Sequence, residues 1–481
     1  MAVPHTFADE SGGIKRQYLD DNFAAVSYRV NAAAFGAKGD NVADDWAALQ
    51  AAINFVQLHT RPDLYNSATP SLGSIELFIP AGYYYVSQPL VIRYPIAIRG
   101  DGCAEFSRGT RITQAFVGDL FSVNPISTGI SVSFTDLTLI SGFGGAGGAQ
   151  VNLLQNGTAA ANSNRFVRVV FGQPQNLAVL VRGDDTVFDT CVFDVSITGS
   201  TNSVQLGTST VGEIASNVRF INCNWFNILG RCVTGVRYRD IVFSNCIVSQ
   251  PSSAFQTAYF FDGLATNQGD AVSISGNFEN VSNILSVNAS CRNFKLANVT
   301  GFNALSSAAH WILNNGAFDL SIFATRCRGF FNTGTYTIYA EGAACSGVSI
   351  NGCSFENSGG TSANALAFNP LSISALNKVR NNLMINWPAQ SVSETRASTG
   401  LLYAPGTVGA SGSVTINRTI AGAKIGDSVE VFPVLGASFF PVGITVNCFV
   451  SAADTVSIRY SNNTATGVVV AAHDLVLECY R

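Results

Sequence analysis

A short pattern recurs along the middle of the chain, between about residues 166 and 355. Each copy is a run of alternating apolar residues, then a Cys or Asn, then another apolar residue. Successive markers are 21 to 32 residues apart. A repeat of this length indicates a solenoid or a propeller. The marker residues are Cys191, Cys223, Cys246, Asn277, Asn298, Cys327 and Cys353.

The spacing favours a parallel β-helix. A propeller blade needs four strands in about 40 to 45 residues, which is longer than the repeat, whereas one turn of a β-helix fits it. A single turn buries its apolar side only by stacking on its neighbours, so equivalent residues should form columns. We expect the marker Cys residues to be small buried hydrophobes, in one column with Asn277 and Asn298, since Asn tolerates a left-handed backbone.

Composition narrows the range of partners and cofactors. The 481 residues carry a net charge of −4 and no run of Lys or Arg, which argues against nucleic acid and anionic membranes as partners. No two of the 11 Cys residues have Cys-x-x-Cys spacing and the four His are far apart, so we expect no metal and no cofactor. The opening lacks a signal peptide and no apolar run reaches 18 residues. We therefore expect synthesis in a cytoplasm and no membrane insertion.

A helix is predicted near the start of the chain, with Asp44 or Asp45 as its N-cap. Four apolar residues recur at helical spacing and form one stripe. Such a helix would cover the exposed edge of the first turn of the coil, which would otherwise invite aggregation. Residues 80–82, Pro-Ala-Gly, are typical of a tight turn between strands. The stripe consists of Leu49, Ala52, Ile53 and Val56.

The same region resembles the pectate-lyase-like β-helix family of the pectate lyase 3 type, through Phe35-Gly-Ala-Lys-Gly-Asp40 and the Ala43-Asp-Asp-Trp46 that follows. Asn41 and Trp46 stand where the family usually has Gly and Thr. The resemblance implies an all-β fold: a right-handed single-stranded parallel β-helix with an N-terminal capping helix, over residues 31–390. The family includes glycan hydrolases, lyases, epimerases and many phage tailspikes.

The first 30 residues resemble the N-terminal segments of bacteriophage tail fibres and tailspikes, through Thr6-Phe7-Ala8, Ile14 and Leu19-Asp-Asp-Asn-Phe23. The family usually has Pro after the Ile, where this chain has residues 15–17, Lys-Arg-Gln. The resemblance implies that residues 1–30 attach the protein to the phage tail or baseplate. The alternative is a disordered terminus.

The end of the chain shows a different pattern. Residues 391–412 are typical of a linker, and strict alternation in 413–481 predicts a small antiparallel β-sandwich. Strands are expected at 414–420, 428–432, 444–450, 456–460 and 475–479. This part loosely resembles the C-terminal modules of phage tail proteins, which implies a role in trimerisation or receptor contact.

Candidate catalytic residues are acids close to aromatic residues, because sugar rings stack on aromatic faces. Glycoside hydrolysis needs two carboxyl groups about 5 to 9.5 Å apart, and adjacent turns of a β-helix are about 4.8 Å apart. The cluster that best fits is Asp262, Asp270 and Glu279, with Tyr259 as a sugar-binding residue. The alternatives are that Asp262 belongs to a turn and that Glu279 is a solvated strand end.

Other candidates are weaker. Asp184 and Asp185 resemble the paired Asp of polygalacturonases, but the companion His-Gly and Arg-x-Lys motifs are missing, and Asp185 also fits a turn. Arg237 and Arg239 are candidates for binding an acidic sugar, unless they are solvated charges at a strand edge. The pair His310 and Trp311 offers an acid–base group beside a stacking ring, unless His310 is simply packed in a loop.

The sequence thus predicts a phage tailspike: a homotrimer in the virion tail that binds, and by hydrolysis or lysis endo-cleaves, a host capsule, exopolysaccharide or lipopolysaccharide. Two alternatives stay open. One is an adhesin that binds without cleaving, and the other is a structural tail scaffold that carries another receptor-binding protein.

Overall fold

The computed structural model describes most of the chain between residues 29 and 480. The described ranges are 29–60, 75–103, 109–126, 130–141, 148–156, 159–194, 202–226, 230–249, 257–262, 270–281, 283–288, 291–302, 312–314, 318–329, 337–340, 348–358, 366–368, 378–380, 382–385, 402–403, 406–420, 423, 425, 428–433, 441–470 and 473–480. The predicted attachment segment 1–30 therefore lies outside the described residues, except for its last two.

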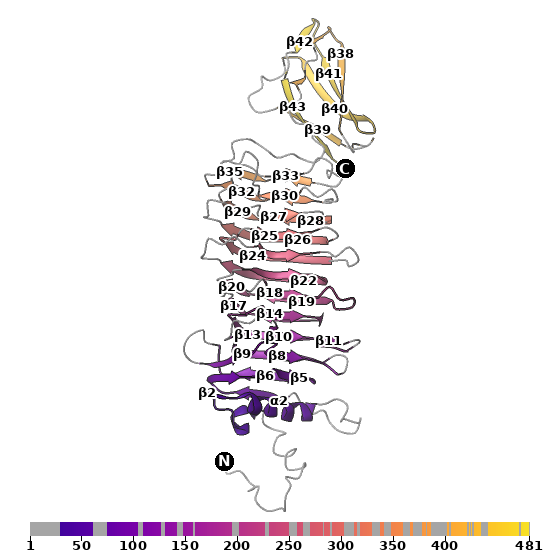
Figure 1. The fold of residues 1–481 in the computed structure, drawn as a ribbon. Coiled ribbons are helices and arrows are strands. Elements are labelled where there is room, and N and C mark those ends of the chain that lie inside the picture. Colours follow the sequence, from indigo (N-terminus) through magenta and orange to yellow (C-terminus); the bar gives the residue numbers. More distant parts are fainter. Residues whose placement is uncertain are drawn as a thin grey trace, which may run out of the picture. The chain divides into compact units, whose positions relative to one another are not determined.

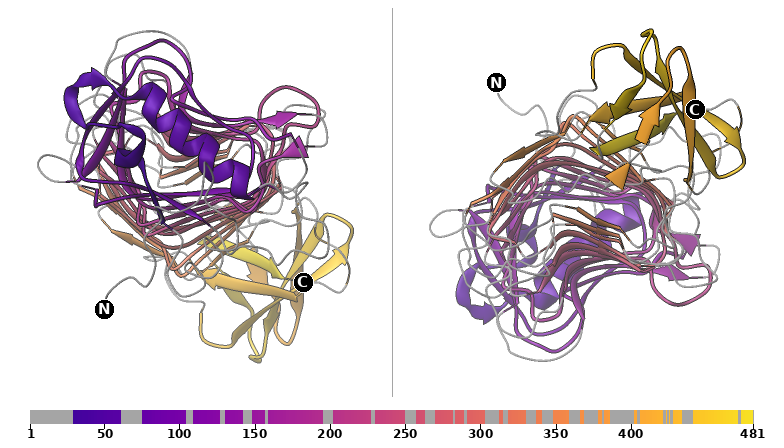
Figure 2. Two further views of the ribbon diagram at one scale, coloured as in Figure 1. Left: turned by 90° about the horizontal axis from the view of Figure 1, so that it is seen from below. Right: turned by 90° about the horizontal axis from the view of Figure 1, so that it is seen from above.

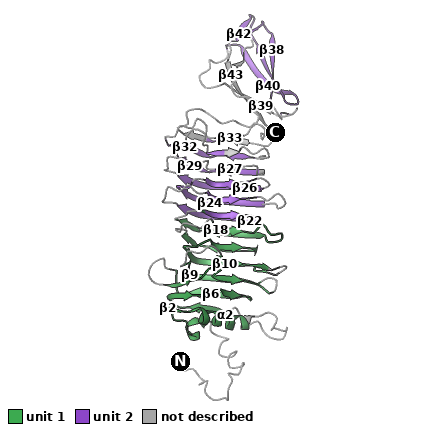
Figure 3. Ribbon diagram, viewed as in Figure 1, with its two compact units in different colours: residues 1–230 green, residues 231–481 purple. Residues whose placement is uncertain are grey.

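The chain divides into two compact units, residues 1–230 and 231–481 (Figure 3). In the first unit, two stacks of parallel strands alternate along the chain, which is the arrangement of a parallel β-helix (Figure 1). One stack, sheet A, contains β1 (Arg29–Asn31), β2 (Asp40–Asp44), β3 (Glu76–Ile79), β4 (Gly82–Val86), β6 (Ile96–Gly100), β7 (Thr110–Gln114), β9 (Val132–Ser141), β13 (Arg165–Gly172), β15 (Gly183–Asp184), β16 (Val187–Asp189), β17 (Val192–Asp194), β19 (Ala215–Ile221) and β20 (Asn224–Phe226). The other, sheet B, contains β5 (Leu90–Ile92), β8 (Phe121–Val123), β10 (Ala149–Leu153), β14 (Leu177–Val181) and β18 (Asn202–Leu206). A hairpin of β11 (Gln155–Asn156) and β12 (Ala159–Ala160) is antiparallel.

Aromatic rings fill the inside of the first unit because register places like residues on successive turns. Phe166 pairs with Phe134 and with Phe188, and the rings stack at centroid distances of 5.3 and 4.7 Å. A second stack joins Phe193 to Trp225 at 4.8 Å. Each such pair adds roughly 0.5–1.5 kcal/mol beyond the area it buries.

The single described α-helix, α2 (Trp46–Thr60), lies across the open end of the first turns (Figure 2). The predicted stripe is confirmed, since all four of its residues are at most 1% exposed. Asp44 accepts a hydrogen bond from the Trp46 N–H, whereas the buried Asp45 carboxylate accepts from the N–H groups of Lys38 and Gly39. A 3₁₀ turn, η1 (Ala32–Phe35), precedes it.

Two glutamine side chains of the helix form hydrogen bonds with backbone groups of the edge strand β5 and the residues just after it. Gln50 donates to the Val91 carbonyl oxygen at 3.0 Å and accepts from the Val91 N–H at 2.7 Å. Two helical turns later, Gln57 bonds the Arg93 N–H and the Tyr94 carbonyl oxygen. These amides take the place of a neighbouring strand, so the predicted covering of the first edge is confirmed.

The second unit is built in the same way, from strands of a sheet A stack and a sheet B stack. Its sheet A strands are β22 (Tyr238–Ser249), β24 (Asp270–Glu279), β26 (Arg292–Phe302), β28 (Phe318–Phe323), β29 (Arg326–Gly329), β31 (Ser349–Asn351), β32 (Ser354–Asn357), β34 (Lys378–Arg380) and β35 (Leu383–Ile385). Its sheet B strands are β21 (Arg231–Gly235), β23 (Thr257–Phe261), β25 (Asn283–Val287), β27 (Ile312–Asn314), β30 (Ile338–Ala340) and β33 (Leu366–Phe368). All these neighbours pair in parallel, so the predicted β-helix is confirmed.

Two marker cysteines of the first unit occupy the same place on consecutive turns. Val192 pairs with Asn224, which aligns the preceding residues Cys191 and Cys223. Both are fully buried, and each thiol lies near the carbonyl oxygen two residues earlier, at 3.7 and 3.6 Å. Each follows a residue with a left-handed backbone. The predicted column of small buried cysteines is therefore present.

In the second unit the column departs from the prediction at three markers. Cys246 lies opposite Gly276 rather than Asn277, which is exposed. Asn298 is the left-handed residue one position before the column. Cys327 pairs with Gly301 and Phe355, two positions beyond it. The left-handed residue, not the Cys or Asn, sets the register, so Cys353 keeps the predicted place whereas Asn277, Asn298 and Cys327 do not.

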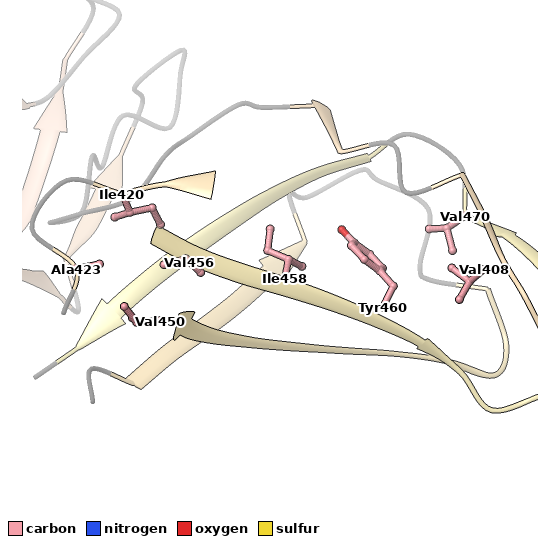
Figure 4. Packing of buried hydrophobic residues seen from close by; sticks show 8 residues of the cluster. All are labelled: Val408, Ile420, Ala423, Val450, Val456, Ile458, Tyr460 and Val470. Carbon is pink, nitrogen blue, oxygen red and sulfur yellow. The ribbon is translucent and has the colours of Figure 1, made fainter. Parts of the chain in front are cut away.

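The last part of the chain forms antiparallel sheets around a small core (Figure 4). Their strands are β36 (Leu402–Tyr403), β37 (Gly406–Val408), β38 (Ser413–Thr419), β39 (Ser428–Pro433), β40 (Ile444–Ala452), β41 (Thr455–Asn462), β42 (Val468–Val470) and β43 (His473–Tyr480). All five predicted strands are found. β36 and β37 fall in the stretch predicted as a linker but pair with β43 and β42.

Candidate functional site

The structure separates Glu279 from Asp270, although both were predicted to act in one site. Asp270 begins β24 and Glu279 ends it, so up to roughly 30 Å of extended chain lies between them. Glu279 is exposed, pairs with Ser249 and Phe302, and accepts a hydrogen bond from the Ser249 hydroxyl at 3.3 Å. Glu279 therefore belongs to a different part of the sheet A surface from Asp270.

Asp262 and Asp270 both lie near the buried Tyr238 in the second unit. Asp262 follows β23, and its carboxylate accepts a hydrogen bond from Asn288 at 3.2 Å. Both acids lie close enough to the hydroxyl of Tyr238 to act on it. Burial, the thiol of Cys291 and these two carboxylates together raise the pKa of Tyr238 well above its ordinary value. The Tyr238 hydroxyl donates to the Cys291 sulfur at 3.0 Å.

The predicted sugar-binding residues of this region have different outcomes. Tyr259 is fully buried and stacks on Phe243 at 4.1 Å, so its ring has no free face for a sugar and that prediction is wrong. Arg237 is 5% exposed, which also excludes it as a surface cation. Arg239 is exposed and pairs in register with Asp270. His310 and Trp311 lie outside the described residues.

In the first unit, Asp185 has a left-handed backbone (φ 56°), and its N–H donates to the Ser216 carbonyl oxygen. It is a turn residue, as the alternative interpretation held. The Asp184 carboxylate accepts a hydrogen bond from the Ser216 hydroxyl. Each member of the pair thus has a local partner within the first unit.

An open groove of about 610 Å³ runs over the outer surface of sheet A in the second unit. Along its floor, Lys295 pairs in register with Ser273 on one side and Ser321 on the other. The Lys295 ammonium lies 5.1 Å from the centre of the Phe323 ring. The groove thus combines a cation, an aromatic face and hydroxyl groups. The residues lining it are Asn293, Phe294, Lys295, Asp319, Ser321, Ile322, Phe323, Ser349 and Asn351.

Asp319 is a groove carboxylate that sequence reasoning missed. Arg292 pairs with Phe318, which places Asn293 beside Asp319. Asn293 also donates a side-chain hydrogen bond to Asp270 on its other side. Asp270 and Asp319 thus lie on strands two turns apart, which are about 10 Å apart by strand spacing, and they are offset by one position in register. This backbone spacing is slightly larger than the separation of about 6.5–9.5 Å between the carboxyl groups of inverting glycosidases. Only the register of β26 and β28 could have revealed this pair.

Within the described ranges, no group of three or more His, Cys, Asp or Glu side chains is placed to hold a metal ion. None of the helices described there has the length and apolar character to cross a membrane.

Residues 29–320 match the family model of the rhamnogalacturonase A/epimerase, pectate lyase-like proteins. No curated protein sequence matches the chain. Among solved structures, the Dettilon tailspike protein is similar over 99% of this chain and 98% of its own, with 12% identity and a TM-score of 0.50. The A-module of a mannuronan C-5 epimerase from Azotobacter vinelandii covers 74% of this chain and 98% of its own, with 15% identity and a TM-score of 0.47. The tailspike of the E. coli bacteriophage HK620 covers 96% and 94%, with 13% identity and a TM-score of 0.45. At such identities the likeness concerns the fold.

Proposed function

The chain belongs to the rhamnogalacturonase A/epimerase, pectate lyase-like family, and we propose that it is a bacteriophage tailspike that binds and cleaves a bacterial surface polysaccharide. The observation that carries this proposal is the groove of the second unit, which is lined by Asp319, Lys295 and Phe323. Asp270 is next to this groove, since it accepts a hydrogen bond from the lining residue Asn293. The fold shared with the Dettilon tailspike supports it.

The proposed roles follow from the chemistry of the side chains. Asp270 and Asp319 act as the acid and base of an endo-hydrolysis, in which one protonates the leaving oxygen and the other activates water. Phe323 offers a face to a sugar ring, and Lys295 pairs with a hydroxyl or an acidic group of the chain. Asp262, which like Asp270 lies near Tyr238, is the further candidate acid.

Cleavage by elimination is the variant mechanism, with Lys295 as the base. In that case the products carry an unsaturated uronate with its ultraviolet absorbance, whereas hydrolysis leaves reducing ends without it. The family holds both kinds of enzyme, and the groove contains the residues for either.

The assembly is part of the same proposal. Three copies would form a homotrimer in the virion tail, attached to tail or baseplate proteins through residues 1–30. The chain would be made in the host cytoplasm. The C-terminal antiparallel sheets would serve receptor contact or trimerisation.

The test is incubation of the purified full chain with capsule, exopolysaccharide or lipopolysaccharide from the host bacterium. Shorter oligosaccharides are expected from the wild type. Asp270→Asn and Asp319→Asn should each lower the rate by about 100-fold or more, since a positioned acid or base contributes about 10²–10⁴. Asp454→Asn is the matched control, because this exposed carboxylate also has a left-handed backbone but lies in the C-terminal sheets.

Other outcomes would change the assignment. Full activity in both groove variants, with loss in Asp262→Asn or Glu279→Gln, would move the site. Binding of polysaccharide without shortening would mean an adhesin. If the protein does not bind at all, it is a structural scaffold.

A further inference from the structure

One side of the C-terminal three-stranded sheet β38–β41–β40 is polar and exposed. Alternation places the apolar residues of these strands against the core shown in Figure 4. The opposite side, here called the polar face, presents hydroxyl, amide and guanidinium groups in register across the three strands. Its exposed residues are Ser413, Thr415, Asn417, Thr445, Asn447, Phe449 and Arg459, and the half-buried Ser461 and the buried Ser457 lie between them.

Phe449 is the exception on this face. Its side chain is 46% exposed, although the core of the sheet lies on the other side. It pairs across the sheet with Ser457 and shares its strand face with Asn447. Arg459, which pairs with Asn447, is the next neighbour on the central strand. The ring is thus an exposed aromatic platform bordered by hydrogen-bonding groups.

These bordering groups keep unused hydrogen-bonding capacity. Asn417 accepts from the Ser457 hydroxyl at 2.6 Å, which leaves its NH₂ group without a partner among the described residues. Arg459 donates to the Ser413 hydroxyl at 3.2 Å and forms no ion pair within that part of the chain. The Asn447 amide has no described partner either. A guanidinium that forms no ion pair among the described residues, two amides and an exposed ring therefore lie together on the polar face.

We propose that the polar face is a second glycan-binding site, and that its ligand is a sugar carrying a carboxylate. The ring of Phe449 stacks on the sugar, Arg459 pairs with the acid group in a fork geometry suited to carboxylates, and Asn417 and Asn447 bond hydroxyls. One cation on this face is too few for a nucleic acid, which needs several phosphate contacts. A protein partner would need a larger apolar centre than a single ring.

Glycan binding at the polar face does not depend on the function proposed for the groove. The experiment must therefore measure binding at the polar face with the groove disabled. The full chain carrying Lys295→Met and Phe323→Ala in the groove is tested by biolayer interferometry. The probes are immobilised host polysaccharide, polygalacturonate and polysialic acid, with dextran as the neutral probe. We expect binding to at least one acidic probe and not to dextran. Adding Phe449→Ala or Arg459→Gln should weaken this binding about tenfold or more.

Two control variants distinguish a specific loss of binding from a loss caused by misfolding. Phe449→Tyr keeps the ring and should retain binding. Tyr83→Ala removes another exposed ring that lies near an arginine, Arg111, in the first unit, and should change nothing. The proposal is overturned if Phe449→Ala binds like its parent, if dextran binds as tightly as the acidic probes, or if no acidic probe binds. It is also overturned if Phe449→Ala lowers the mass of the assembly in light scattering, because the face would then join copies of the chain.

Discussion

The side-chain amide of Asn293 donates a hydrogen bond to the carboxylate of Asp270 on the preceding turn. Asn293 lies between Asp270 and Asp319, so it fixes the orientation of one acid next to the other. Its own backbone is left-handed (φ 57°), a conformation in which Asn and Gly are both tolerated. Glycine at this position would therefore remove the amide with little change to the turn.

We predict that Asn293→Gly lowers polysaccharide cleavage about tenfold by releasing Asp270. In the Asp270→Asn background the same substitution should have no further effect, because coupled residues are not additive. The measurement is a double-mutant cycle on kcat/KM. Asn298→Gly, at an exposed left-handed position on the same strand, is the control. Equal effects of Asn293→Gly in both backgrounds would contradict the coupling.

The close approach of the backbones in the column of the second unit predicts that two Gly→Ala substitutions destabilise the protein by different amounts. A Cβ on Gly276 would lie 2.0 Å from the Cys246 carbonyl oxygen, and its φ is +140°. Gly352 has φ +63° with open space around its Cβ position. Gly276→Ala should therefore cost about 3 kcal/mol or more, and Gly352→Ala about 1 kcal/mol. Urea unfolding measures both, and equal costs would contradict the close approach.

Much of this fold could be predicted from the sequence because every turn of the β-helix must bury its apolar side against the neighbouring turns. The alternating runs, the helical stripe from Leu49 to Val56 and the buried Cys191 and Cys223 follow from burial alone. The misassigned markers, such as Asn277 and Cys327, show where this reasoning fails. Spacing identifies a turn, but the register depends on which residue is left-handed, and several residue types, including Thr190 and Ala324, fill that role.

The ion pair of Asp136 with Arg168 predicts a pH-dependent stability in the first unit. The guanidinium of Arg168 donates to both carboxylate oxygens, at 2.5 and 2.8 Å. These hydrogen bonds hold the pKa of Asp136 below its ordinary value. A carboxyl group with a lowered folded-state pKa stabilises the protein above its unfolded pKa, about 3.9, and this contribution is lost as the pH falls through the lower folded value.

Arg168→Ala should therefore lower the free energy of unfolding by about 0.5–1 kcal/mol at pH 7, a small amount because the guanidinium is half exposed. The difference from the wild type should shrink as the pH falls below about 4. Arg165→Ala is the control, because the carboxylate with which Arg165 pairs, on Asp189, lies 3.9 Å away and so interacts weakly. A difference that grows in acid would contradict the assignment.

The two hydrogen bonds between Gln50 and the edge strand β5 predict that Gln50 stabilises the packing of the capping helix on the β-helix. Gln50→Ala leaves the Val91 N–H and carbonyl oxygen without their partner and should cost roughly 1–3 kcal/mol. Leu58→Ala, an exposed position of the same helix, should stay within about 0.5 kcal/mol of the wild type. Thermal unfolding followed by circular dichroism compares the two variants. Equal midpoint temperatures would show that the hydrogen bonds of the Gln50 amide to β5 do not stabilise the protein.

The candidate site was less accessible to sequence reasoning than the fold. Asp270 was found because it lies near aromatic residues in the sequence, but Tyr259 proved to be one of the inward-facing rings. Asp319 stands 49 positions after Asp270, and only the stacking of turns brings them to one surface. Whether a side chain faces inward or outward changes with a one-residue shift of register, so a site assembled across turns requires the structure.

In the proposed site, sugar binds across Lys295 and Phe323 in the groove, next to the carboxyl groups of Asp319 and Asp270. A crystal structure of the full-length Asp319→Asn variant soaked with an oligosaccharide of the host polysaccharide tests it most directly. The account predicts sugar density in the groove, with a ring over Phe323 and a glycosidic oxygen within reach of Asp270. Sugar bound elsewhere on the β-helix, with the groove empty, would contradict it.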